Sequence, residues 1–198
     1  MKAYKKYLWC VLVLWQSTAL SVEFDSSITA TSQWAIDTNK VDSQSLSLSI
    51  VPEMNIDFEN DWQLKSKVRF RAEAIDDMQI NDLDRDGFSD YSKPVQLNDG
   101  VEFELRELYL QGGIGNTFLT LGKQQIVWGK ADGLKVLDIV NPQSFREFIL
   151  DDFDSSRIPL WTMNIERTVA DWDLQFLWIP DQSYHALPKQ DATYAFTS

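Results

Sequence analysis

"DWQLKSKVRFRAEA" (61–74) alternates between two kinds of side chain along its length. From Trp62 onward one parity reads Trp, Leu, Ser, Val, Phe, Ala, Ala, and the other reads Gln, Lys, Lys, Arg, Arg, Glu. Successive side chains of a strand point to opposite faces, so this pattern predicts a β-strand with one apolar and one charged face. The apolar face must meet either a protein core or lipid.

Similar alternation recurs along the chain. Residues 46–58, 158–167 and 172–178 each place apolar side chains on one parity, and weaker patterns cover 28–37, 101–111 and 117–127. In the 101–111 stretch the apolar parity changes near Glu107, which predicts a β-bulge or bend. The sequence therefore predicts seven strands, with a possible eighth beginning near Ala192.

The connections between these strands differ in length. Three are tight, "ENDW" (59–62), "GIGN" (113–116) and "RTVADW" (167–172), whereas those at 76–99 and 127–158 are long. Outer-membrane β-barrels have short turns at one end and long loops at the other. We therefore expect an antiparallel all-β outer-membrane barrel, which the strand count predicts to be incomplete. The alternative is a periplasmic or extracellular β-sandwich whose apolar face is buried.

The N-terminus has the composition of a secretory signal peptide. Lys2, Lys5 and Lys6 precede a short apolar run, and small and polar residues follow. The alternative, a membrane anchor, is disfavoured because the run is far shorter than the ~20 residues that a spanning helix needs. We expect a signal peptide at 1–21, which would remove Cys10, and an N-terminal portion of a barrel at 22–198.

Composition limits the partners. The formal net charge is −12, which argues against general binding to nucleic acid or to an anionic membrane surface. Eight Trp, six Tyr and eleven Phe suit a protein that faces both lipid and water. Outer-membrane lipid and an unidentified transported solute are the expected partners.

Two groups of charged residues are candidates for a solute path. Lys65, Lys67, Arg69 and Arg71 would line a water-filled lumen if the opposite face meets lipid. In the second long connection, Asn141-Pro142 predicts the start of a short helix. Charged side chains after it, with Arg146, Glu147 and Arg157 as the candidates, would fold inward and constrict a pore. The alternative is a solvated outer loop.

The first long connection contains "DLDRDGFSD" (82–90). Carboxylates at alternate positions followed by Gly predict a weak Ca²⁺ site, formed by Asp82, Asp84, Asp86 and Asp90. Position twelve is Lys93 in place of the Glu of an EF-hand, so the loop is closer to extracellular calcium-binding repeats. The alternative is an acidic, solvated loop. Calorimetry without a calcium-dependent heat would exclude the site.

Three motifs carry a resemblance to a known family: "GKQQIVWG" (122–129), "LDIVNPQSFREF" (137–148) and "SRIPLW" (156–161). Over residues 100–180 the chain resembles a Gram-negative family of outer-membrane, porin-like proteins long catalogued as a domain of unknown function. The resemblance implies a β-barrel in the outer membrane that passes or exports a hydrophobic or otherwise unidentified compound. It also implies a longer protein, since family members usually exceed this length.

The sequence offers no set of catalytic residues. His185 is the only histidine and lacks recognisable nucleophile or metal-site partners, and "GGIGNT" (112–117) lacks the βαβ context of a nucleotide site. We expect a channel or export barrel without enzymatic activity. The alternative is a non-channel secreted or periplasmic β-sheet binding protein with a calcium-ordered loop, and a lipid-modifying barrel enzyme is a third hypothesis.

Overall fold

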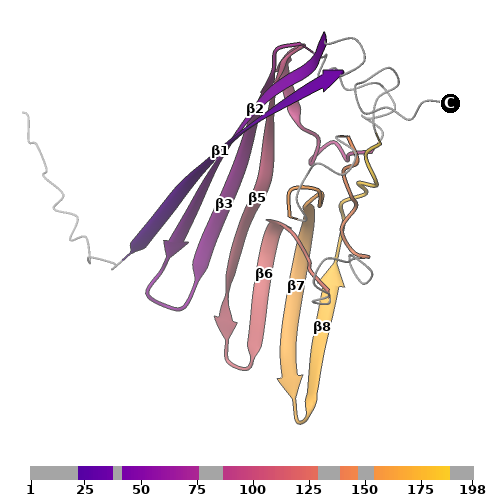
Figure 1. The fold of residues 1–198 in the computed structure, drawn as a ribbon. Coiled ribbons are helices and arrows are strands. Elements are labelled where there is room, and N and C mark those ends of the chain that lie inside the picture. The colour runs from indigo at the N-terminus through magenta and orange to yellow at the C-terminus, as the bar shows by residue number, and fades with distance from the viewer. Residues whose placement is uncertain (1–21, 38–41, 76–86, 129–138, 147–153, 188–198) are drawn as a thin grey trace, which may run out of the picture.

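The computed structural model describes residues 22–37, 42–75, 87–128, 139–146 and 154–187. Within these ranges the protein is all-β, and eight strands form one antiparallel sheet (Figure 1). The strands are β1 (Glu23–Asp37), β2 (Asp42–Asp57), β3 (Gln63–Glu73), β4 (Val95–Asn98), β5 (Val101–Ile114), β6 (Thr117–Gln124), β7 (Leu160–Val169) and β8 (Trp172–Trp178). The expected signal peptide and the possible strand near Ala192 lie outside the described residues.

The order of strands follows the chain. The sheet runs β1-β2-β3-β5-β6-β7-β8, and the short β4 pairs with the beginning of β5. All seven strands predicted from alternation are confirmed, whereas β4 lies within a stretch that we expected to be a loop. In the described residues β1 and β8 do not pair with each other, so the sheet is open, as expected for an incomplete barrel.

Tight turns gather at one end of the sheet (Figure 1). They join β2 to β3, β5 to β6 and β7 to β8, and each contains a residue with positive φ: Asp61 (57°), Gly115 (62°) and Ala170 (53°). Such backbone conformations match the twist of short antiparallel hairpins. The predicted alternation of short and long connections is therefore confirmed.

The two faces of the sheet differ in polarity. Apolar side chains on one face remain exposed, among them Phe70 (43% exposed), Leu174 (54%) and Phe176 (57%). Among the described residues no second sheet covers this face, so the sandwich alternative, with these residues buried, is wrong. We call this the outward face, and the opposite, polar one the inward face.

Close packing on the outward face explains one glycine. Gly112 of β5 lies beneath the indole of Trp62, and a Cβ built on Gly112 would come within 2.4 Å of the ring. The neighbouring Gly113 has open space around the same position. Trp62 thus needs a residue without a side chain at position 112 but not at position 113.

The predicted short helix after Asn141 is wrong for the described residues 139–146. Gln143 and Ser144 instead form isolated β-bridges with Arg157 and Ala186. A helix N-cap side chain would accept hydrogen bonds from the first turn of its own helix. The Asn141 side chain instead accepts one from the N–H of Ile126 (2.7 Å) and donates to the carbonyl of Ile158 (2.9 Å). The Asn141 side chain therefore links its own segment to those that contain Ile126 and Ile158.

Candidate functional site: a charge network on the inward face

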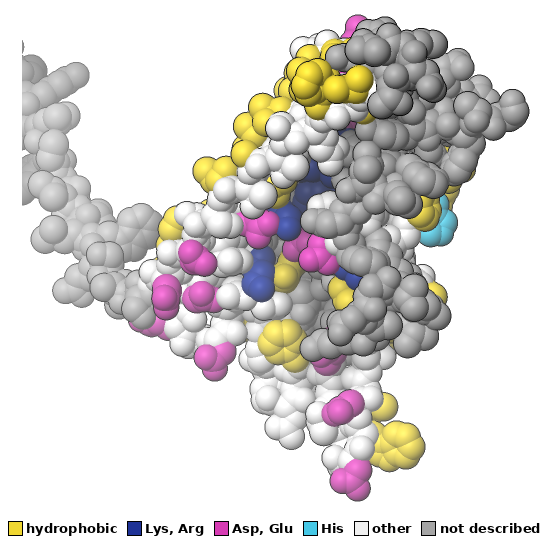
Figure 2. Space-filling model, in the orientation of Figure 1, with side chains coloured by type: hydrophobic (Ala, Val, Ile, Leu, Met, Phe, Trp, Pro, Cys, Tyr) yellow, Lys and Arg dark blue, Asp and Glu magenta, His cyan; other side chains and the backbone are white. Residues whose placement is uncertain are grey.

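Charged side chains of both signs gather in the hollow of the inward face (Figure 2). The alternation of β3 points Arg69 and Arg71 to this face, and its antiparallel register pairs them with Glu104 and Glu102 of β5. Opposite charges directly across a strand pair stabilise each other. The register of β3 on β5 therefore builds the centre of the site.

One ion-pair chain starts at Arg69. Its Nη2 lies 2.6 Å from Oε2 of Glu104, whose Oε1 lies 3.2 Å from Nη1 of Arg106. Arg106 also donates from Nη2 to the backbone carbonyls of Asp154 (3.0 Å) and Arg157 (2.7 Å). Glu104 and Arg106 are almost completely buried. Arg106 thus connects the sheet to the segment that crosses its inward face.

A second chain is centred on Glu102, which is 1% exposed. Arg71 Nη1 approaches Oε1 of Glu102 at 3.6 Å, and Arg146 donates to both of its carboxylate oxygens at 3.1–3.2 Å. Charge-assisted hydrogen bonds of this two-pronged kind fix geometry as well as adding energy. Arg146 is thereby held against the inward face. We call Arg69, Arg71, Glu102, Glu104, Arg106 and Arg146 together the charge network.

A β-bulge makes this arrangement possible. Lys67 pairs with Glu107 and Val68 with Leu105, so Arg106 is an extra residue on β5 without a partner on β3. The bulge confirms the change of parity predicted near Glu107. It lets Arg106 join Glu104 in the charge network while Leu108 and Leu110 face outward.

Irregular segments cover the upper part of the inward face and hold one another by backbone hydrogen bonds. Ser144 donates to the carbonyl of Ser156 (2.7 Å) and Phe145 to that of Ala186 (2.7 Å). His185 Nδ1 accepts from the N–H of Gln143 (2.9 Å), so this lone histidine serves the packing of the segments. A small apolar core of Phe88, Ile158 and Ala186 lies between them.

After β6 the chain folds toward the inward face. Gln125 donates to Glu107 (2.9 Å), and the indole Nε1 of Trp128 donates to Oε1 of Gln175 (2.8 Å). Gln175 in turn donates to Asn164 of β7 (3.0 Å). Trp128 therefore lies over the polar surface of β7 and β8.

The expected lumen-lining residues fall on the same face but differ in environment. Lys65 and Lys67 are half-buried, and Lys67 pairs with Glu53 of β2 (2.7 Å). Arg69 and Arg71 are buried within the charge network. Of the expected constriction residues, Arg146 binds Glu102, Arg157 binds Asp154 (2.7 Å), and Glu147 lies outside the described residues.

The expected calcium ligands are only partly described. Asp82, Asp84 and Asp86 lie outside the described residues, and Asp90 pairs with Lys93 at 2.9 Å on the surface. Among the described residues no group of three or more His, Cys, Asp or Glu side chains is placed to hold a metal ion.

Sequence reasoning missed Glu102, Glu104 and Arg106, the central members of the charge network. Their signal is the alternation of "VEFELRE" (101–107), which places them opposite Val101, Phe103 and Leu105. Aligning this pattern against "KVRFR" (67–71) would have paired each carboxylate with an arginine.

The fold and the site define a class of protein. It has an open antiparallel β-sheet whose outward face is apolar and uncovered and whose inward face carries a buried charge network. Residues 19–170 match the family described as a protein of unknown function, DUF1302, and the chain belongs to this family. No curated protein and no solved structure matches the chain. In the described part of the chain, no helix has the length and apolar character needed to cross a membrane.

Proposed function

We propose that this protein forms part of the wall of an outer-membrane β-barrel of porin-like type, which passes or exports a solute along its inward face. The observation that carries the proposal is the contrast between the two faces of a single layer. A strand in a barrel wall needs one face for lipid and one for the interior.

The outward face has the chemistry for lipid. Large apolar side chains are exposed on every long strand from β1 to β8, and Trp172 and Trp178 stand at the two ends of β8. Aromatic residues at the ends of strands suit the girdles where lipid meets water. Exposed members on the outward face include Phe24, Ile28, Trp34, Leu46, Leu48, Ile50, Phe70, Leu108, Leu110, Leu121, Leu174 and Phe176.

The inward face has the chemistry for a selective path. The segment around Arg146 crosses the face and is held there by Glu102, while Arg106 holds the carbonyls beside Arg157. A loop fixed inside a barrel by opposing charges narrows the passage and biases the passing ions. Lys65 and Lys67 continue this face toward the end with the tight turns.

A second candidate function is a non-channel secreted or periplasmic binding protein. The observation that favours it is the closure of the upper inward face, where Glu102 and Glu104 are only 1–2% exposed. Such a protein would use the covered face for stability and the remaining surface for a partner.

Cell fractionation separates the two candidates. A barrel is expected in the outer-membrane fraction, resisting extraction by urea, because its apolar face is embedded in lipid. Recovery of the folded protein in the soluble periplasmic extract would overturn the barrel proposal. Planar-bilayer recordings of the purified protein then test the path, with discrete conductance steps as the expected result.

A further inference from the structure

The sheet has an interruption beside β5. On one edge of β5, β4 pairs with residues 101–103 and β6 pairs with residues 108–114. Residues 104–107 therefore have no strand partner on that edge in the described ladders. The strand wall is incomplete at this place, and the segment 88–94 lies across it.

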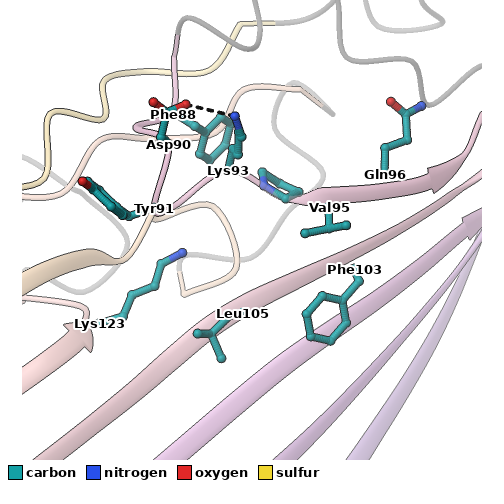
Figure 3. Close-up of a pocket in the computed structure, with 10 residues that line it drawn as sticks. Phe88, Asp90, Tyr91, Lys93, Val95, Gln96, Phe103, Leu105 and Lys123 are labelled. Atoms are coloured by element: carbon teal, nitrogen blue, oxygen red, sulfur yellow. Dashed lines mark hydrogen bonds and ion pairs between the residues drawn. The ribbon is translucent and has the colours of Figure 1, made fainter.

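A cavity of about 510 Å³ occupies this interruption (Figure 3). Its wall has an apolar part and a polar part. The apolar part is Phe103 and Leu105 of β5, Val95 of β4, and Phe88, Tyr91 and Pro94 from the segment before it, and the polar part is Asp90, Lys93, Gln96 and Lys123. Phe103 and Leu105 belong to the outward parity of β5, since Glu102 and Glu104 point inward. The cavity thus lies within the interruption, between the outward-facing Phe103 and Leu105 and the apolar core of the covering segments, to which Phe88 belongs.

A buried ammonium group reaches into this cavity, where the carboxylates of Glu104 and Asp181 are near enough to act on its charge. Lys123, near the end of β6, pairs with Leu108 and Trp161 on the outward parity, yet it is only 1% exposed. Figure 3 shows its side chain extending from β6 toward the space below the segment 88–93. Among the described residues its Nζ makes one hydrogen bond, to the carbonyl of Ser92 (3.2 Å), and no ion pair.

The backbone before Lys123 is built for this placement. Gly122 has φ +133°, and a Cβ there would come within 2.2 Å of the carbonyl oxygen of Leu108. Any other residue would be strained and would collide with β5. β6 therefore bends directly before Lys123, whose ammonium group enters the cavity.

We propose that this cavity binds one acyl chain and the anionic head group of an amphiphile. The head group, a carboxylate or phosphate, accepts hydrogen bonds from the two free N–H groups of Lys123. The chain lies along Phe103, Leu105 and Val95. A volume of this size is typical of a ligand pocket. A second cation, Lys93, lines the cavity and pairs with Asp90.

This inference rests on the proposed function, because the ligand enters from the lipid that the outward face would meet. It extends that function by naming the chemical class of the solute. The same chemistry occurs in a free long-chain carboxylate, which would be cargo, and in a phosphate-bearing membrane lipid, which would be a structural ligand.

The test is a binding titration of the full protein in a non-ionic detergent. The probes are dodecanoate, a phosphate-bearing lipid (lipid A) and uncharged dodecanol. We expect an anionic probe to bind at least about tenfold more weakly to Lys123→Met, because the charge-assisted hydrogen bonds are lost. Lys123→Arg should retain binding, and Leu105→Trp should abolish it by filling the cavity.

Arg167→Met is the matched control, since it removes an exposed cation near the tight turn between β7 and β8. Binding of dodecanoate would show that the cavity holds a transported carboxylate, and binding of lipid A alone would show that it holds a membrane lipid. Either result supports an anionic ligand. Equal affinity of wild type and folded Lys123→Met, no binding of either anionic probe, or equal binding of dodecanol and dodecanoate overturns the inference. Fractionation reports independently on the proposed function, so the two failures are distinguishable.

Discussion

Arg146 donates to both carboxylate oxygens of Glu102, although 44 residues separate them in the chain. Glu102 is held on β5, whereas Arg146 belongs to an irregular segment that crosses the inward face. The contact therefore fixes part of a long connection onto a strand of the sheet. Both the stability of this cover and the width of any path beneath it depend on this pair.

Arg146→Gln should destabilise the protein by about 3–5 kcal/mol, because it leaves the carboxylate of Glu102 buried with only the longer contact to Arg71. The double variant Glu102→Gln/Arg146→Gln should lose less than the single variant, since neither charge remains. Urea unfolding in detergent measures both. Lys93→Gln, which breaks an exposed pair with Asp90, should cost at most about 1 kcal/mol.

The same arginine should control conduction if the proposed path exists. Arg146→Ala and Arg157→Ala each remove a positive charge beside the inward face, so single-channel conductance and cation preference should both rise. Planar-bilayer recording at low salt gives the comparison, because screening is weakest there. Conductance and selectivity equal to wild type in both variants would contradict a constriction at this segment.

Gly112→Ala should destabilise the protein by about 1–3 kcal/mol, because its Cβ would overlap the Trp62 indole. Gly113→Ala is the matched control: it has open space and should change the unfolding free energy by less than about 0.5 kcal/mol. Denaturant unfolding monitored by tryptophan fluorescence compares them. Equal effects of the two variants would show that the overlap relaxes at no cost.

Ile28→Arg and Thr29→Arg discriminate lipid from water on the two faces of β1. Both positions are exposed, and Ile28 is on the outward face with 74% exposure, so neither change disturbs a protein core. In lipid, Ile28→Arg should cost about 2–4 kcal/mol near the membrane centre, whereas Thr29→Arg should be nearly neutral. Folding yield and stability in lipid vesicles provide the measurement. A neutral Ile28→Arg would contradict a lipid-facing surface.

Asp181 should make the packing of residues 87–92 sensitive to acid. Burial raises the pKa of Asp181, but hydrogen bonds from Ser92, Ser183 and the N–H of Trp161 outweigh this and hold the pKa below its usual range. The stabilisation is therefore present above the unfolded-state pKa and is lost as pH falls through the folded-state pKa.

Hydrogen exchange of residues 87–92 at decreasing pH, corrected for the intrinsic rate, measures this loss. Asp181→Asn should expose these residues to exchange already at neutral pH and remove the acid dependence below pH ~4. Persistence of the acid dependence in this variant would assign it to another group.

Much of the fold was predictable because it depends on local alternation. The period of two in "DWQLKSKVRFRAEA" fixed which face of β3 is charged, and the parity change near Glu107 revealed the bulge. β4 escaped prediction because "VQLN" is short and follows Pro94 within a polar stretch. β6 ends at Gln124, earlier than its pattern suggested, because Ile126 turns inward to bond with Asn141.

The site was less predictable because it depends on pairing between distant segments. The charges of Arg69 and Arg71 were evident, but their neutralisation by Glu104 and Glu102 follows from strand register. The position of Arg146 follows from contacts of an irregular segment, which has no periodic signal. Sequence patterns thus predicted the faces of single strands, whereas the partners across those faces required three-dimensional placement.

The cross-strand ion pairs also disfavour a shifted register between β3 and β5. A slip of one residue between β3 and β5 would turn Glu102 and Glu104 toward the apolar side, and Arg69 and Arg71 would lose both carboxylates. Unpaired charges in an apolar environment are strongly unfavourable. The side chains that give the inward face its charge therefore also disfavour wrong pairing of β3 and β5. The same four residues determine both the strand register and the chemistry of the inward face.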